Sequence, residues 1–152
     1  MKKRLLLAVS LVLAVGALVV PLASSHDSGR ITIGVRLNFA QPEAAGTFAA
    51  CCAFTDSGTA TAEITRYDPE GDHIRFEATN SFVGSDGSFT LRLRGVTGPA
   101  ESAVHVARGR WIVIGGTGAY AGMEGRGKLT AVTDQTTGEL TAIDKGHVSL
   151  DD

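Results

Sequence analysis

Few residues in this sequence have a reactive polar side chain at a position that is predicted to face an apolar interior. Asn80 and Asp144 are the clearest, because both fall on the apolar side of an alternating segment. Their companions on that side are Phe76, Ala78 and Phe82 for Asn80, and Leu140, Ala142 and Val148 for Asp144. A carboxyl group in a dry interior has a shifted pKa and can do general acid–base work. A hydrogen bond to a bulge or neighbouring strand is the more common role of such residues, so both interpretations stay open.

Aromatic residues would line any pocket for a small molecule, although most of them are expected to be core. The residues expected to bind a ligand are Phe76, Asn80, Phe89, Trp111, Tyr120 and Asp144. No catalytic residue is named, because no serine, histidine and aspartate stand on a recognisable nucleophile turn.

Cysteine and histidine do not form a metal-binding pattern. Cys51 and Cys52 are the only cysteines, and neighbours in a strand point to opposite faces, so a bridge between them would need a strained turn. We expect two small, buried or half-buried thiols, with a redox or intermolecular role as the alternative. The histidines are scattered and are expected to be surface or hydrogen-bonded residues: His26, His73, His105 and His147.

Arg108 and Arg110 flank Gly109 and share one face with Ile112 and Ile114. If this face lined the mouth of a barrel, the two guanidinium groups could hold a carboxylate. The outward direction is favoured, since charged residues rarely face a closed core without a partner.

The elements that must position these residues are strands. Alternation with a period of two recurs along the chain, and Gly, Asp, Pro and Ser clusters separate the segments. The expected strands are 30–39, 46–54, 59–67, 73–83, 88–94, 104–114, 127–132 and 140–150, with hairpin turns at 56–58, 68–72, 85–87 and 134–138. Short strands with hairpin links predict an all-β sandwich or up-and-down barrel. Eight strands suit a small closed barrel, whose interior can hold side chains or one small ligand.

A glycine-rich stretch, WIVIGGTGAYAGMEGRG, covers residues 111–127. Its first part is similar to a dinucleotide-binding turn, but that motif requires a helix after the glycines. Gly122, Gly125 and Gly127 would break such a helix, and another strand pattern follows. We therefore expect a tight connection with close strand approach rather than a nucleotide site.

Residues 115–129, GGTGAYAGMEGRGKL, resemble the glycine segment of allene oxide cyclases and plant dirigent proteins, with Tyr120 as its aromatic residue. Residues 46–48 and 54–59 resemble a segment of small secreted bacterial members of this superfamily. The resemblance implies an all-β fold, an eight-stranded antiparallel barrel of calycin-like type, and a homodimer or homotrimer. It also implies cofactor-free action on a small hydrophobic molecule, as in ring closure or the guiding of reactive intermediates. The glycine segment is structural and brings no catalytic residue with it.

The first 25 residues read as a secretion signal. A basic head (Lys2, Lys3 and Arg4) precedes an apolar run and small residues, so we expect cleavage before His26 and a secreted, extracellular domain over 26–152. An uncleaved membrane anchor is the alternative, because the apolar run nearly reaches spanning length. Of 14 basic and 16 acidic residues, cleavage removes three basic ones and leaves a net charge of −5, which disfavours nucleic acid and anionic membranes as partners.

Three functions remain open at this point. The barrel could be a cofactor-free cyclase, isomerase or dirigent-like guide, which works largely by holding a reactive molecule in one conformation. It could be a carrier of a small hydrophobic ligand, or a structural barrel filled by its own side chains. The many Ala and Gly residues on the strands favour the first two, because they leave room for a cavity.

Overall fold

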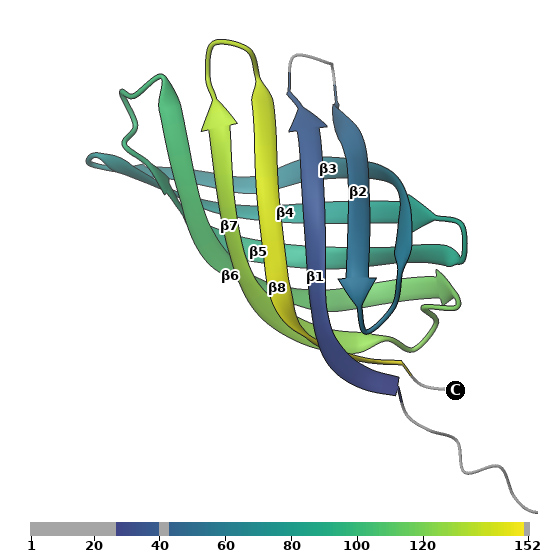
Figure 1. The fold of residues 1–152 in the computed structure, drawn as a ribbon. Coiled ribbons are helices and arrows are strands. Elements are labelled where there is room, and N and C mark those ends of the chain that lie inside the picture. Colours follow the sequence, from purple (N-terminus) through teal and green to yellow (C-terminus); the bar gives the residue numbers. More distant parts are fainter. Residues whose placement is uncertain (1–26, 40–42, 151–152) are drawn as a thin grey trace, which may run out of the picture.

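The computed structural model describes residues 27–39 and 43–150, and it forms one closed barrel of eight antiparallel strands (Figure 1). Each strand pairs with its neighbours in sequence, and β1 closes the ring against β8. The strands are β1 (Asp27–Asn38), β2 (Ala44–Cys52), β3 (Asp56–Glu70), β4 (His73–Gly84), β5 (Gly87–Gly98), β6 (Val104–Gly118), β7 (Glu124–Asp134) and β8 (Glu139–Leu150). The eight-stranded antiparallel barrel is confirmed, and of the two architectures that the alternation allowed, the barrel and not the sandwich is found.

The signal segment expected over residues 1–25 lies outside the described residues. Cleavage and the extent of the mature domain over 26–152 therefore stay predictions. No helix in the described part of the chain is long and apolar enough to span a membrane.

The alternation also fixes which side chains enter the barrel. In β1, Ile31, Ile33, Val35 and Leu37 are each at most 5% exposed, while Arg36 between them faces solvent. The burial of alternate apolar side chains is the main stabilising contribution in such a sheet.

Several strands are longer than expected: β3 extends to Glu70 into the expected 68–72 turn, β5 extends to Gly98 and β6 extends to Gly118. Residues 56–58 were expected to form a turn, but they begin β3 and pair with β2 and β4. Asp56 explains the difference, because its side chain is buried and accepts hydrogen bonds from the backbone N–H groups of Ser57 and Ser85 and from the Ser85 hydroxyl. The Asp56 carboxylate is thus satisfied by Ser57 of its own strand and by Ser85 of the β4–β5 connection, so it is not needed to cap a turn.

One end of the barrel is filled by an aromatic cluster, defined here as Phe48, Phe54, Phe82, Phe89 and Tyr120. Ring centroids of contacting pairs in the cluster lie 4.7–5.7 Å apart. Most pairs are edge-to-face, an arrangement that aromatic rings prefer. The buried Tyr120 hydroxyl donates a 2.7 Å hydrogen bond to Asp56, so the phenol has a partner inside this end.

The glycine-rich stretch places Tyr120 there. Residues up to Gly118 belong to β6, β7 starts at Glu124, and no helix lies between them. A Cβ atom at Gly116 would collide with the backbone of Tyr120, and Gly118 has a φ of +61°. Glycine is therefore required at both positions for the chain to fold back and close the aromatic end.

Candidate functional site

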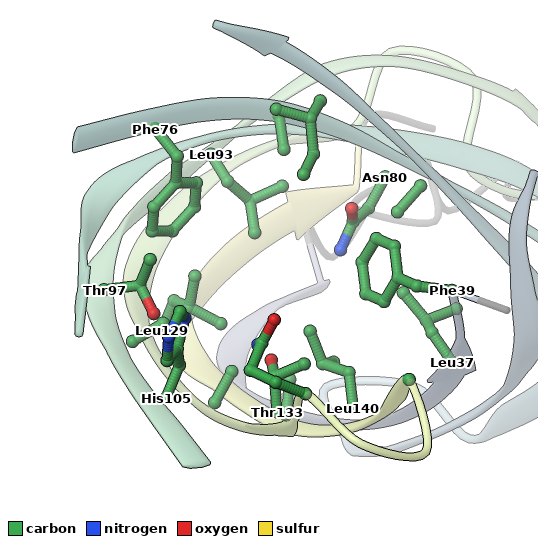
Figure 2. Close-up of a pocket in the computed structure, with 18 of the residues that line it drawn as sticks. Leu37, Phe39, Phe76, Asn80, Leu93, Thr97, His105, Leu129, Thr133 and Leu140 are labelled. Carbon is green, nitrogen blue, oxygen red and sulfur yellow. The ribbon is translucent and has the colours of Figure 1, made fainter. Parts of the chain in front are cut away.

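The opposite end of the barrel holds a cavity of about 480 Å³ (Figure 2). Its mouth is bordered by Phe39, which follows β1, and by the β7–β8 connection, and every strand except β2 contributes lining side chains. A volume of this size is typical of sites for small organic ligands.

The cavity exists because the inward side chains at this end are small. Five alanines, from β3, β4, β6, β7 and β8, line it where the aromatic end has rings: Ala62, Ala78, Ala107, Ala131 and Ala142. Larger apolar residues complete the wall: Leu37, Phe39, Phe76, Leu93, Leu129 and Leu140. The resulting surface is suited to an apolar molecule.

A β-bulge shapes the rim. The register between β3 and β4 shifts between Ile64 and Arg66, so the inward side of β3 passes from Ile64 to Tyr67. Tyr67 is 55% exposed at the mouth, where its ring borders the cavity and its hydroxyl can reach water. The alternation rule alone could not place Tyr67 here, because a single extra residue reverses the side on which every later side chain falls.

Two buried polar side chains enter this apolar wall. Asn80 of β4 is 6% exposed, and no hydrogen-bond partner for its amide is found among the described residues. His105 of β6 is 7% exposed, and one ring nitrogen lies 3.3 Å from the carbonyl oxygen of Ala100. Figure 2 shows both at the cavity, projecting from different walls. An unpaired amide in an apolar cavity can donate to or accept from a polar group of a ligand.

Asp144 lies just beneath the cavity. It follows the lining residue Ala142 on the inward side of β8, and its cross-strand neighbours are Leu129 and Ile33. The side chain is fully buried, and neither carboxyl oxygen has a partner among the described residues. Burial alone raises the pKa of Asp144 to about 7, because the charged form loses its hydration. The carboxyl group is thus poised to titrate near neutral pH.

The six residues expected to bind a ligand fall into separate groups. Phe76 and Asn80 line the cavity. Phe89 and Tyr120 belong to the aromatic cluster at the other end, and Asp144 lies under the floor. Trp111 is 1% exposed in the core, where a Cβ atom at Gly127 or Gly146 would collide with its ring. The structure brings two of the six to one cavity, and their role in binding stays a prediction.

His105 lines the cavity although its sequence position did not predict a binding role. A signal was present, because His105 stands on the same side of β6 as Ala107 and Trp111. Both faces of that segment carry apolar groups, so the inward side could not be chosen from the sequence.

The arginine and cysteine pairs both lie outside the cavity. Arg108 and Arg110 are exposed, as favoured from the sequence. The expectation of buried or half-buried thiols was wrong, since Cys51 and Cys52 are both exposed. Cys52 ends β2 with a φ of +93°, which turns its side chain away from the strand alternation and leaves the two Sγ atoms 2.6 Å apart.

Within residues 27–39 and 43–150, no group of three or more histidine, cysteine or acidic side chains could hold a metal ion. Comparisons with protein families, curated proteins and solved structures find no match to this chain. The site is thus a mainly apolar cavity with the Asn80 amide and the His105 imidazole in its wall and the buried Asp144 carboxyl group below it.

Proposed function

We propose that this chain is a secreted barrel of the allene oxide cyclase and dirigent type, and that it binds a small hydrophobic molecule in the open end. The cavity carries the proposal. A barrel with a purely structural role would be filled by its own side chains, whereas five alanines keep this end hollow. The closed eight-stranded topology and the glycine connection before β7 support the family assignment.

Asn80 defines the chemistry of the ligand. Alanine, leucine and phenylalanine side chains make up most of the remaining wall, with His105, Thr97, Thr133 and the β7–β8 connection as polar parts. A bound molecule therefore gains most of its affinity from burial of its own apolar surface. The Asn80 amide faces the cavity, where a polar group of a ligand can donate to it or accept from it. The preferred ligand is therefore a mainly apolar molecule with one carbonyl or hydroxyl group that reaches Asn80.

Binding is tested with an environment-sensitive apolar dye and by native mass spectrometry of protein purified from the culture medium. We expect the dye to become fluorescent in the wild type and to lose binding in Ala131→Phe, because the new ring occupies the chamber. Ala49→Phe is the matched control, since Ala49 is exposed on β2. Equal dye binding by all three proteins would exclude the cavity as the site.

Cofactor-free conversion of the ligand, as a cyclase, an isomerase or a dirigent-like guide, is the second candidate. The observation that favours it over simple carriage is the pair of polar groups in the wall, Asn80 and His105, above the buried Asp144. Such groups can orient a substrate and stabilise developing charge in a site that excludes water.

Asn80→Leu separates the two candidates once a ligand has been recovered by mass spectrometry. The substitution keeps a similar size and removes the hydrogen-bonding group. A carrier should retain most of its affinity for the ligand, whereas a catalyst should lose turnover by much more than it loses binding. If the recovered molecule leaves the wild-type protein unchanged after prolonged incubation, conversion of that molecule is excluded.

A further inference from the structure

The outer surface of the barrel carries a strongly uneven charge. The described residues contain eleven arginines and lysines, and three of them, Arg36, Arg66 and Arg75, lie apart from the rest. The other eight form one surface, called here the basic face: Arg30, Arg92, Arg94, Arg108, Arg110, Arg126, Lys128 and Lys145. The face extends over β5, β6, β7, β8 and the start of β1, and a net negative chain thus carries a positive side.

The register turns part of this face into a straight row. Arg94 pairs with Arg110, Arg110 with Lys128, and Lys128 with Lys145, so four consecutive strands each place a cation at the same level. Residues directly opposite in antiparallel strands point to the same side and lie close together. At the usual strand spacing the four charges span about 14 Å.

A second row runs beside the first. Arg92 pairs with Ile112, Ile112 with Arg126, Arg126 with His147, and His147 with Arg30. A groove of about 390 Å³ lies at the β5–β6 end of the two rows, lined in part by Arg92, Arg94 and Arg110. The outer surface is therefore hollowed where the guanidinium groups gather.

Apart from Arg94, the cations of this face have no ion-pair partner among the described residues. Arg94 forms an ion pair with Glu77 at 3.3 Å. The remaining ion pairs of the described residues involve Arg66 and Arg75, which lie outside the basic face. Like charges directly opposite one another destabilise a sheet. A row of four such residues is a cost to the fold that an anionic partner would relieve.

We propose that the basic face binds a linear acidic polysaccharide, whose carboxylates align with the rows of cations. A sugar chain with one carboxylate per unit repeats its charge at intervals comparable to the spacing of strands. Six of the eight cations are arginines, whose planar fork matches a carboxylate with two parallel hydrogen bonds. The expected secretion places the protein where such polymers occur.

Other polyanions fit this face less well. Anchoring to a membrane surface commonly uses exposed tryptophan or tyrosine, but Trp111 is buried in the core and the exposed Tyr67 lies at the cavity mouth. Single-stranded nucleic acid is held by stacking on aromatic rings. The basic face carries aliphatic residues such as Ile112 between its cations. Trp111 lines its groove but is only 1% exposed, so the face offers no exposed indole or phenol ring, and His147 is its exposed imidazole.

The test measures binding of the full secreted protein to polygalacturonate at low salt and during a salt titration. We expect binding that weakens steeply as salt rises, because the polymer's counterions are released on association. Arg110→Glu with Lys128→Glu should weaken binding by about tenfold or more, since two attractive contacts become repulsive. Thermal unfolding of the variant checks that the barrel is intact.

The matched control is Arg36→Glu with Arg66→Glu, which changes the net charge equally on other parts of the surface. It should stay within about threefold of the wild type, because screened charges act over roughly a Debye length. No binding by the wild type, or an equal loss in both double variants, would overturn the proposal. Tighter binding to duplex DNA or to vesicles of anionic phospholipid would overturn it as well. The apolar-dye assay reports on the cavity separately, so failure here leaves the proposed ligand site standing.

Discussion

Asp144 makes the stability of the barrel depend on pH in an unusual direction. Its carboxyl group is fully buried and unpaired among the described residues, and burial raises its pKa from 3.8 to about 7. The folded state holds this proton more tightly than the unfolded state. The contribution of protonated Asp144 to the free energy of unfolding is therefore fully present below pH 3.8. That contribution is lost as the pH rises to about 7.

The size of the effect follows from the shift. About three pKa units correspond to about 4 kcal/mol in the free energy of unfolding, a large part of the stability of a domain this size. Asp144→Asn removes the titration while keeping the shape of the side chain. The variant should therefore gain about 4 kcal/mol relative to the wild type between pH 4 and pH 8.

Urea unfolding at several pH values measures this difference. With an m-value of about 2 kcal/mol/M, the separation of the two midpoints should change by about 2 M over this range. Other carboxyl groups titrate in both proteins and cancel in the comparison. Asp56 is one of these, since hydrogen bonds from Tyr120 and Ser85 lower its pKa to about 2 against the opposing effect of burial.

Asp144→Leu provides a second variant that cannot titrate and carries no polar group. Its difference from the wild type should follow the same curve against pH, displaced by a constant that reflects packing. A flat difference for both variants would mean that the Asp144 carboxyl is hydrated or paired in the folded protein, and the reasoning from burial would be refuted.

Three further changes test other parts of the barrel. Tyr120→Phe removes a hydrogen bond to the Asp56 carboxylate and should cost about 1.5–3 kcal/mol, measured by urea unfolding at pH 7, and a cost near zero would show that water replaces the phenol. Gly146→Ala should cost about 1–3 kcal/mol and alter the fluorescence of the single tryptophan, because the new methyl group meets the indole ring, whereas unchanged emission would contradict this packing. Diamide, a thiol oxidant, should convert Cys51 and Cys52 of the monomer into an internal disulfide, and the loss of two hydrogen atoms is detected by intact mass. Disulfide-linked dimers would instead indicate that the thiols react between molecules.

The alternation of apolar and polar residues predicted the eight strands, and the choice of a closed barrel over a sandwich came from their number and from the family resemblance. The alternation needs no long-range information, because each strand of this barrel pairs with its neighbours in sequence and only the β1–β8 seam is remote. The same rule put Asn80 and Asp144 inside, and both are buried. It failed at local irregularities, namely the bulge before Tyr67 and the positive φ of Cys52, where the side on which a residue falls depends on backbone detail.

The position of the cavity was harder to predict, because a cavity forms only where the side chains around it leave space. An alanine that packs against a ring and an alanine that borders empty space look the same in sequence, so the aromatic end and the open end could not be told apart. The basic face was hidden for a related reason. Net charge averages over the molecule, whereas the row from Arg94 to Lys145 exists only once the register aligns four strands.

The seam between β1 and β8 sets the order in which this protein can fold. Every other ladder is a hairpin that can form as soon as its two strands are available, but β1 must wait for the last strand before it has its second partner. Closure brings together the most distant parts of the chain and therefore carries the largest loop entropy. Until then β1 and β7 present open edges, which are templates for pairing with other chains. β8 therefore closes the barrel, and its loss would leave an open sheet with two exposed edges that is prone to aggregation.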